Sequence, residues 1–165
     1  EAIEAFEILK EQGKIREYGV SSIRPNVIRE WIKRSNMVSV MMQYSLLDRR
    51  PEEEALNLLN ENNISVITRG TIAKGLLVGK PPKKYLRYSE ADVQKLQSAL
   101  EKTEDPLSTS IQFVLDHPAV ASSVLGIRTM NQLESFIQSD FHSLRKSDMT
   151  ALKNELPSNR YENHR

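Results

Sequence analysis

The chain has 165 residues, of which 39% are hydrophobic, so it is long and apolar enough to form one ordinary domain with a core. Lys and Arg number 23 against 22 Asp and Glu, so no basic field argues for a nucleic-acid partner or an anionic membrane surface. The absence of cysteine excludes disulfides and thiolate metal sites and favours the cytoplasm, and no apolar run is long enough to cross a membrane.

The first residues already have a helical pattern. Ala2, Phe6 and Leu9 fall on one face, and Gly13 stands where a helix commonly ends. Residue 1 is Glu, with neither an initiating Met nor a capping residue before the pattern begins. We interpret the chain as cut inside or beside a helix, with a further segment of the protein upstream.

Two units of strand and helix follow. The segment from Ile15 to Val20 alternates apolar and polar residues, which predicts a strand that ends at Ser21 and Ser22. Pro25 opens a helix that ends near Asn36. The apolar run from Met37 to Met42 lacks alternation, as is typical of a strand covered on both faces. Polar residues come after it, namely Gln43, Tyr44, Ser45, Asp48 and Arg49.

A third unit extends from Pro51 to Lys80. Pro51 and the three glutamates after it predict a helix start, because carboxylates favour the positive end of the helix dipole. The apolar run from Ile64 to Thr68 predicts the next strand. It leads into small residues flanked by Arg69 and Lys74, the composition of an anion-contacting loop.

The rest of the chain predicts a long loop, four helices and one strand. Residues 81–88 lack periodicity and form a loop expected to overhang the site, and Ser89 caps the helix after it. A short helix over 107–116 precedes a strand over 120–125. Thr129 and Gln132 have the spacing of a capping box, Ser147 is expected to cap a last helix, and residues 157–165 form a frayed polar tail.

Four strands that are each followed by helical sequence imply right-handed crossovers and a parallel sheet, whose ligands bind at the carboxyl ends of the strands. All four ends are polar or carry glycine: Ser21 and Ser22, Gln43 and Tyr44, Arg69 to Lys74, and Gly126 to Thr129. A complete barrel of eight units needs about 250 residues. We therefore predict an α/β chain whose residues 1–156 form the C-terminal half of a (β/α)8 TIM barrel, with the other half upstream.

Four segments, in this order and at these spacings, resemble the C-terminal half of an aldo-keto reductase. They are GKIREYGVSS (13–22), QYSLLDR (43–49), SVITRGTIAKGLLVGK (65–80) and GIRTMNQLES (126–135). The resemblance covers nearly the whole chain except the tail. It implies an eight-stranded barrel that binds NADP(H) without a Rossmann domain and reduces aldehydes and ketones to alcohols.

The resemblance assigns three strand ends to the nicotinamide. Ser21 and Gln43 match positions that contact the carboxamide, the alternative being that both satisfy the backbone. Ser22 replaces the Asn common in this motif. Arg69 stands where many members have an aromatic ring stacked on the nicotinamide, and its planar guanidinium can also stack and adds a charge near the pyrophosphate. The alternative for Arg69 is a salt bridge at the barrel mouth.

The phosphates are assigned to two further segments. The loop that covers the pyrophosphate is matched by Gly70, Ile72, Lys74, Gly75 and Lys80, where glycine lets backbone N–H groups approach phosphate oxygens. For Lys74 the alternative is a solvated charge at the rim.

Beyond Gly126, Arg128 is expected to bind the ribose 2′-phosphate at a helix N-terminus, with Gln132 as a further phosphate contact. A preference for NADPH over NADH depends mainly on Arg128. Ser135 and Phe136 depart from the Glu-Asn pair that the family usually offers to adenine.

No catalytic residue and no metal ligand is expected on this chain, because the family's catalytic Asp, Tyr, Lys and His lie in the N-terminal half. We interpret His117, His142 and His164 as structural or solvated, and Tyr18 and Tyr44 as poor candidates for the proton donor. The expected partners are a small carbonyl substrate and the missing half of the barrel. A non-catalytic NADP(H) sensor or adaptor is the competing hypothesis, and the charge balance disfavours a nucleic-acid module.

Overall fold

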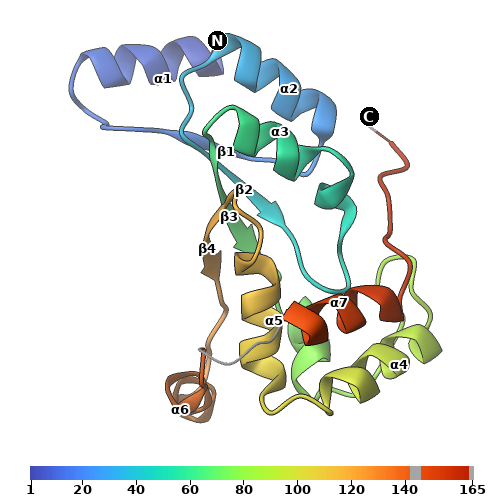
Figure 1. Ribbon diagram of the computed structural model, residues 1–165. Coiled ribbons are helices and arrows are strands. Elements are labelled where there is room, and N and C mark those ends of the chain that lie inside the picture. The colour runs from blue at the N-terminus through green and yellow to red at the C-terminus, as the bar shows by residue number, and fades with distance from the viewer. Residues whose placement is uncertain (142–145, 164–165) are drawn as a thin grey trace.

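The computed structural model describes residues 1–141 and 146–163 (Figure 1). Its helices, 3-10 helices (η) and strands, in chain order, are α1 (Ala2–Glu11), β1 (Gly19–Ser21), α2 (Pro25–Arg34), β2 (Ser39–Gln43), η1 (Arg50–Glu53), α3 (Ala55–Glu61), β3 (Ser65–Arg69), η2 (Ala73–Val78), α4 (Glu90–Leu100), α5 (Pro106–Leu115), β4 (Val120–Val124), α6 (Met130–Gln138) and α7 (Lys146–Glu155).

The strands form one parallel sheet in the order β1-β2-β3-β4, so strands that are consecutive in the chain are also neighbours in space. The register pairs Gly19 with Ser39 and continues through Gln43 opposite Arg69. A β-bulge between Val66 and Ile67 shifts the register with β4. Helical segments connect successive strands, as parallel pairing requires. The predicted α/β class with a parallel sheet is therefore confirmed.

One face of the sheet forms the core. Val40, Met42 and Val66 are fully buried on this face, in the same hydrophobic cluster as Ile28 of α2 and Leu59 of α3. The alternate residues of β2 are only half-buried. The prediction that Met37 to Met42 is covered on both faces is therefore wrong for the described residues, because the helices bury only the face that every second side chain occupies.

Two predicted elements differ in extent from the sequence-based expectation. The strand expected from Ile15 begins at Gly19, since its pairing with β2 starts opposite Ser39. The helix expected from Pro51 is divided into η1 and α3. Two of its three glutamates bind arginine: Glu54 accepts from Arg29 at 2.6 and 2.7 Å, and Glu52 from Arg49 at 2.8 Å. The third, Glu53, accepts from the backbone N–H of Tyr161 at 3.3 Å.

The capping predictions have mixed outcomes. Ser89 and Asp92 form the full capping box of α4. At α6 the Thr129 hydroxyl accepts from the backbone N–H of Gln132, but the Gln132 side chain reaches the N–H of Arg128 instead of Thr129, so only half of the box forms. Ser147 lies inside α7, which spans Lys146–Glu155, so it is not the residue before the helix.

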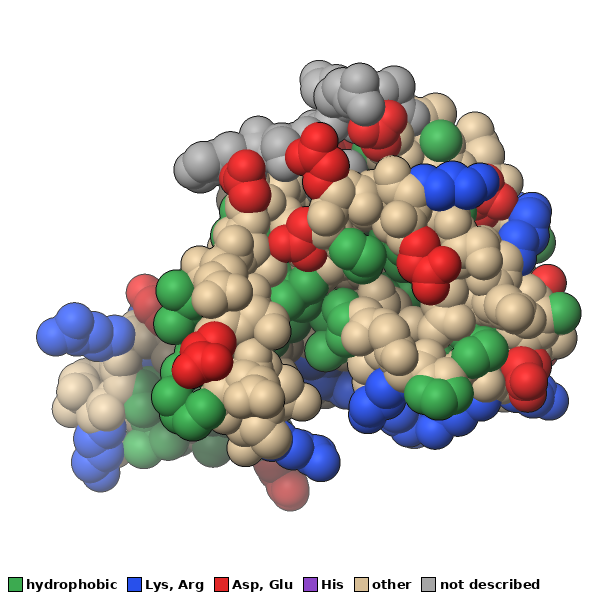
Figure 2. All heavy atoms as spheres, turned by 90° about the horizontal axis from the view of Figure 1, so that it is seen from below, with side chains coloured by type: hydrophobic (Ala, Val, Ile, Leu, Met, Phe, Trp, Pro, Cys, Tyr) green, Lys and Arg blue, Asp and Glu red, His purple; other side chains and the backbone are tan. Residues whose placement is uncertain are grey.

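The helix α6 forms where it was predicted, but within the described residues its apolar side chains are at most partly covered. Met130 and Ile137 are 65% and 69% exposed, and no α6 residue is buried. Figure 2 shows hydrophobic side chains at the surface on the face seen from below. The amphipathic pattern thus identified the helix without identifying what packs on it.

The expected frayed tail is instead packed over residues 157–163. Asn159 and Tyr161 are buried. The Asn159 side chain accepts from the backbone N–H of Arg49 at 2.8 Å and donates to the carbonyl of Leu47 at 3.5 Å, and the Tyr161 ring lies 5.1 Å from the guanidinium carbon of Arg50. The polar composition suggested fraying, but these polar groups satisfy the backbone of the loop after β2.

We expect Asn159→Ala to lower the free energy of unfolding by about 1–3 kcal/mol, because it leaves a part-buried N–H and a buried carbonyl without their partner. Urea denaturation followed by circular dichroism measures the change. The exposed Asn154 of α7 provides the matched control: Asn154→Ala is expected to leave stability unchanged or to raise it by about 0.5 kcal/mol. Equal values for the two variants would mean that the tail does not stabilise the fold.

Candidate functional site

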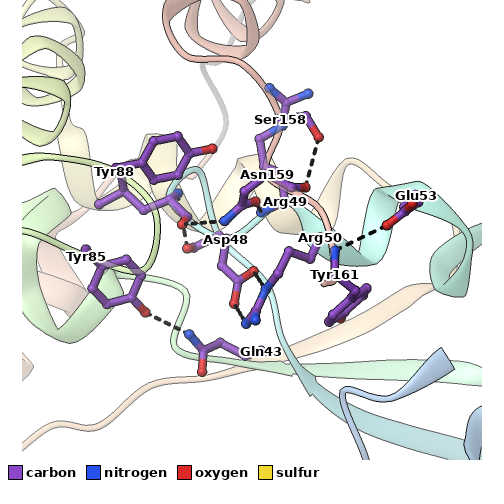
Figure 3. Close-up of polar contacts among 12 residues, drawn as sticks. Gln43, Asp48, Arg49, Arg50, Glu53, Tyr85, Tyr88, Ser158, Asn159 and Tyr161 are labelled. Carbon is purple, nitrogen blue, oxygen red and sulfur yellow. Dashed lines mark hydrogen bonds and ion pairs between the residues drawn. The ribbon is translucent and has the colours of Figure 1, made fainter. Parts of the chain in front are cut away.

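The carboxyl ends of β2 and β3 bring together two of the predicted site residues. Gln43 and Arg69 are register partners on adjacent strands. A guanidinium nitrogen of Arg69 donates to Gln43 Oε1 over a long 3.4 Å, and Gln43 Nε2 donates to the hydroxyl of Tyr85 at 2.8 Å. Figure 3 shows Tyr85 reaching Gln43 from another part of the chain. The Gln43 side chain is thus held by side chains, and not by the backbone groups that were its alternative partners.

The end of β1 lies beside β2. Ser22 donates its backbone N–H to the carbonyl of Met41 at 3.1 Å, and its hydroxyl accepts from the N–H of Arg24 at 3.1 Å. That hydroxyl therefore orders the turn before α2. Ser21 is exposed at the same strand end.

The loop after β3 is shaped by positive φ angles at Gly70 (+71°) and Gly75 (+94°). The side chain of Lys80 covers Gly75, and its ammonium donates to the carbonyl of Lys74 at 2.8 Å. Lys80 therefore braces the loop, whereas Lys74 is exposed. The predicted anion-contacting loop is in fact partly ordered as η2, with Ile72 immediately before it.

The segment after β4 carries Gly126 and Arg128, both exposed. The side-chain oxygen of Gln132 accepts from the backbone N–H of Arg128 at 2.8 Å, so Gln132 orders this turn. Among residues 1–141 and 146–163, neither Arg128 nor Arg69 forms an ion pair. The salt bridge considered as an alternative for Arg69 is therefore absent from this part of the chain.

A buried charged network after β2 was not predicted. Asp48 is fully buried and accepts two 2.7 Å bonds from Arg50. Beside it Arg49 pairs with Glu52 at 2.8 Å, and the Tyr44 hydroxyl donates to Glu52 at 2.9 Å. The sequence contained the signal, since Asp48 directly precedes two arginines, but periodicity does not reveal which charges become buried.

Three residues that were not expected to be catalytic have structural hydrogen-bond partners, namely Tyr44, Tyr18 and His117. Burial, with Glu52 next, raises the pKa of Tyr44, so its phenol stays neutral. Tyr18 donates to Glu7 and accepts from the N–H of Asn36. Burial lowers the pKa of His117, whose Nδ1 accepts from the N–H of Ala119 at 3.2 Å. His142 and His164 lie outside the described residues.

Other possible sites among the described residues do not involve the predicted positions. A cavity of about 600 Å³ lies between α4, α5 and α7, and none of the predicted site residues lines it. In the part of the chain that the structure describes, no cluster of His, Asp and Glu is placed to hold a metal ion. None of the helices described is both long and apolar enough to span a bilayer.

The comparisons with known proteins identify the class. The model of the aldo/keto reductase family matches residues 1–155, so the chain belongs to that family and the predicted resemblance is confirmed. It is 46% identical over a 178-residue alignment to an uncharacterized oxidoreductase, YqkF, of Bacillus subtilis (strain 168), covering all of this chain and 58% of that protein.

Two further matches differ in extent. The holo form of the aldo-keto reductase AKR11C1 from Bacillus halodurans superposes with a TM-score of 0.89 at 42% identity, covering 98% of this chain and 57% of that one. The NADH-specific methylglyoxal reductase of Escherichia coli (strain K12) is 33% identical over 86 residues, 52% of this chain and 26% of that protein. The chain thus spans little more than half the length of YqkF and of AKR11C1, the two proteins that match nearly all of it. Its fold is the predicted half of a reductase barrel.

Gly19 permits the close approach of β1 to β2, since a Cβ there would lie 2.4 Å from the backbone oxygen of Ser39. We expect Gly19→Ala to lower the free energy of unfolding by about 1–3 kcal/mol through overpacking against the backbone. Thermal and urea unfolding measure it. Gly126→Ala is the control, because nothing lies within 4 Å of a Cβ at that position; a loss of stability as large as that of Gly19→Ala would contradict this account of β1.

Proposed function

We propose that this chain is the NADP(H)-binding C-terminal half of an aldo-keto reductase that reduces aldehydes or ketones to alcohols. The observation that carries the proposal is the contact of Gln43, Arg69 and Tyr85 at the carboxyl edge of the sheet. Parallel α/β sheets bind their ligands at this edge. Family membership supports an oxidoreductase activity.

At the nicotinamide end, Gln43 and Ser21 bind the carboxamide. The oxygen Gln43 Oε1 retains a lone pair beside its long bond from Arg69, and a carboxamide N–H donates to it. The Ser21 hydroxyl and Ser22 are the remaining cofactor-binding residues at the nicotinamide end. The exposed guanidinium of Arg69 lies against the nicotinamide face and is a positive charge near the pyrophosphate.

At the phosphate end, the loop after β3 covers the pyrophosphate, through Gly70, Ile72, Gly75 and the exposed Lys74. Lys80 contributes by holding this loop closed over Gly75. After Gly126, the exposed Arg128 binds the ribose 2′-phosphate, and Gln132 supports it by fixing the backbone at Arg128.

Catalysis requires residues beyond this chain. When bound, the reduced nicotinamide supplies the hydride that the carbonyl carbon accepts. The chain's own residues bind and orient the cofactor, while the group that protonates the carbonyl oxygen belongs to the N-terminal half of the barrel, which is also the partner of this half. We therefore expect the chain alone to be inactive, and we assign the complete protein to the cytoplasm, in keeping with the absence of cysteine from the 165 residues of this chain.

The test is an assay of the protein that carries the complete barrel. A broad panel of aldehydes and ketones is offered with NADPH, and loss of the nicotinamide absorbance is followed together with formation of the alcohol. Reduction of at least one carbonyl is the expected result, and the isolated chain serves as the inactive control. Binding of NADPH without turnover of any carbonyl in the panel would instead favour the competing function, a non-catalytic NADP(H) sensor or adaptor.

Arg128→Ala in the complete protein is expected to raise the Kd for NADPH about 10- to 100-fold, because one charge-assisted phosphate contact is lost. The Kd for NADH, which lacks the 2′-phosphate, is expected to change less than twofold. Isothermal titration calorimetry measures both. Arg160→Ala, at an exposed arginine of the tail, is the matched control, and equal losses for NADPH and NADH would refute the assignment of Arg128.

A further inference from the structure

Tyr85 is the residue that joins the loop over 81–88 to the strand end that carries Gln43. The two residues are 42 positions apart in sequence, yet Gln43 Nε2 lies 2.8 Å from the Tyr85 hydroxyl oxygen. Tyr85 as a whole residue is only 8% exposed. The contact is therefore a packed feature of the molecule and not a chance meeting of two surface side chains.

The loop holds Tyr85 firmly in this place. Its backbone N–H and carbonyl exchange hydrogen bonds with those of Tyr88 at 3.1 and 3.0 Å, and Leu86 between them has a positive φ of 51°. Tyr88 in turn donates its hydroxyl to the carbonyl of Pro157 at 2.8 Å. The two backbone bonds that close this turn thus set the position of the Tyr85 ring, whereas the Tyr88 hydroxyl ties the turn to the tail.

The two hydrogen-bond partners of the Gln43 side chain determine which of them its amide oxygen faces and which its amide nitrogen faces. A guanidinium is only a donor, so the group that faces Arg69 must be the amide oxygen. The amide nitrogen then faces Tyr85, where the phenol oxygen accepts from it. Burial, with Asp48 next, raises the pKa of Tyr85, so this phenol stays neutral and keeps both its proton and its accepting lone pairs.

We propose that Tyr85 is a positioning residue for the recognition of a primary carboxamide: it fixes the Gln43 side chain so that Oε1 is presented to an amide N–H of the ligand. The proposal rests on the proposed function, in which that ligand group is the nicotinamide carboxamide. Without the Tyr85 hydroxyl, the terminal torsion of Gln43 is free to rotate, since this sp³–sp² torsion has broad minima. Binding must then order the amide, which weakens affinity.

The test compares three ligands on the complete-barrel protein and its Tyr85→Phe variant. NADP⁺ carries the carboxamide, its 3-acetylpyridine analogue carries a methyl group in place of the amide nitrogen, and 2′,5′-ADP lacks the nicotinamide. We expect Tyr85→Phe to raise the Kd for NADP⁺ about three- to tenfold, the loss of one hydrogen bond. The Kd values for the analogue and for 2′,5′-ADP are expected to change less than twofold.

Tyr88→Phe is the matched control, because it also removes one hydrogen-bonded hydroxyl from a buried tyrosine of the same turn without touching Gln43. Its Kd for NADP⁺ is expected to stay within twofold, with a melting temperature comparable to that of Tyr85→Phe. In a Gln43→Ala background, Tyr85→Phe is expected to have no further effect on NADP⁺ binding, as coupling through Gln43 requires.

Three outcomes would overturn the proposal: an unchanged Kd for NADP⁺, equal weakening of NADP⁺ and the acetyl analogue, or equal weakening by Tyr88→Phe. The last result would mean that affinity follows the stability of the turn. These outcomes leave the proposed function standing, because the unaltered protein still binds NADP⁺. Failure of the unaltered protein to bind NADP⁺ would remove the proposed function and this inference together.

Discussion

The parallel pairing of β2 with β3 is the constraint on which the rest of the candidate site depends. Parallel strands in register end at the same edge of a sheet, so Gln43 and Arg69 become neighbours although 26 positions separate them. The buried alternate residues, such as Val40 and Val66, hold this register, because a slip by one residue would expose them. The core therefore aligns the two side chains.

A second interaction supports the same edge from outside the sheet. The fully buried Asp48 is compensated by two bonds from Arg50, which offsets the cost of removing a carboxylate from water. The tail covers this pair, with Tyr161 against Arg50 and Asn159 bonded to the backbone of the loop. The loop after β2 and the C-terminal residues thus form one packed unit beside Gln43, as Figure 3 shows.

Several elements were predictable because local sequence specifies them. Ser89 with Asp92 begins α4, Gly13 has the positive φ expected after a helix, and the strand ends carry the polar residues that a parallel sheet would present to a ligand. Other expectations failed where a distant partner decides the outcome. The polar composition of the tail predicted that it would be frayed. Its Asn159 instead completes backbone hydrogen bonds of residues about 110 positions away.

The family, the parallel α/β class and the residues at the strand ends can be inferred from the sequence alone, since they follow from short motifs, their order and their periodicity. How those residues are held depends on the tertiary structure. It brought Tyr85 onto Gln43, turned Lys80 back to the loop backbone and buried Asp48 against Arg50. The physical reason is that hydrogen-bond partners and burial depend on which segments meet in space, and no local pattern encodes that meeting.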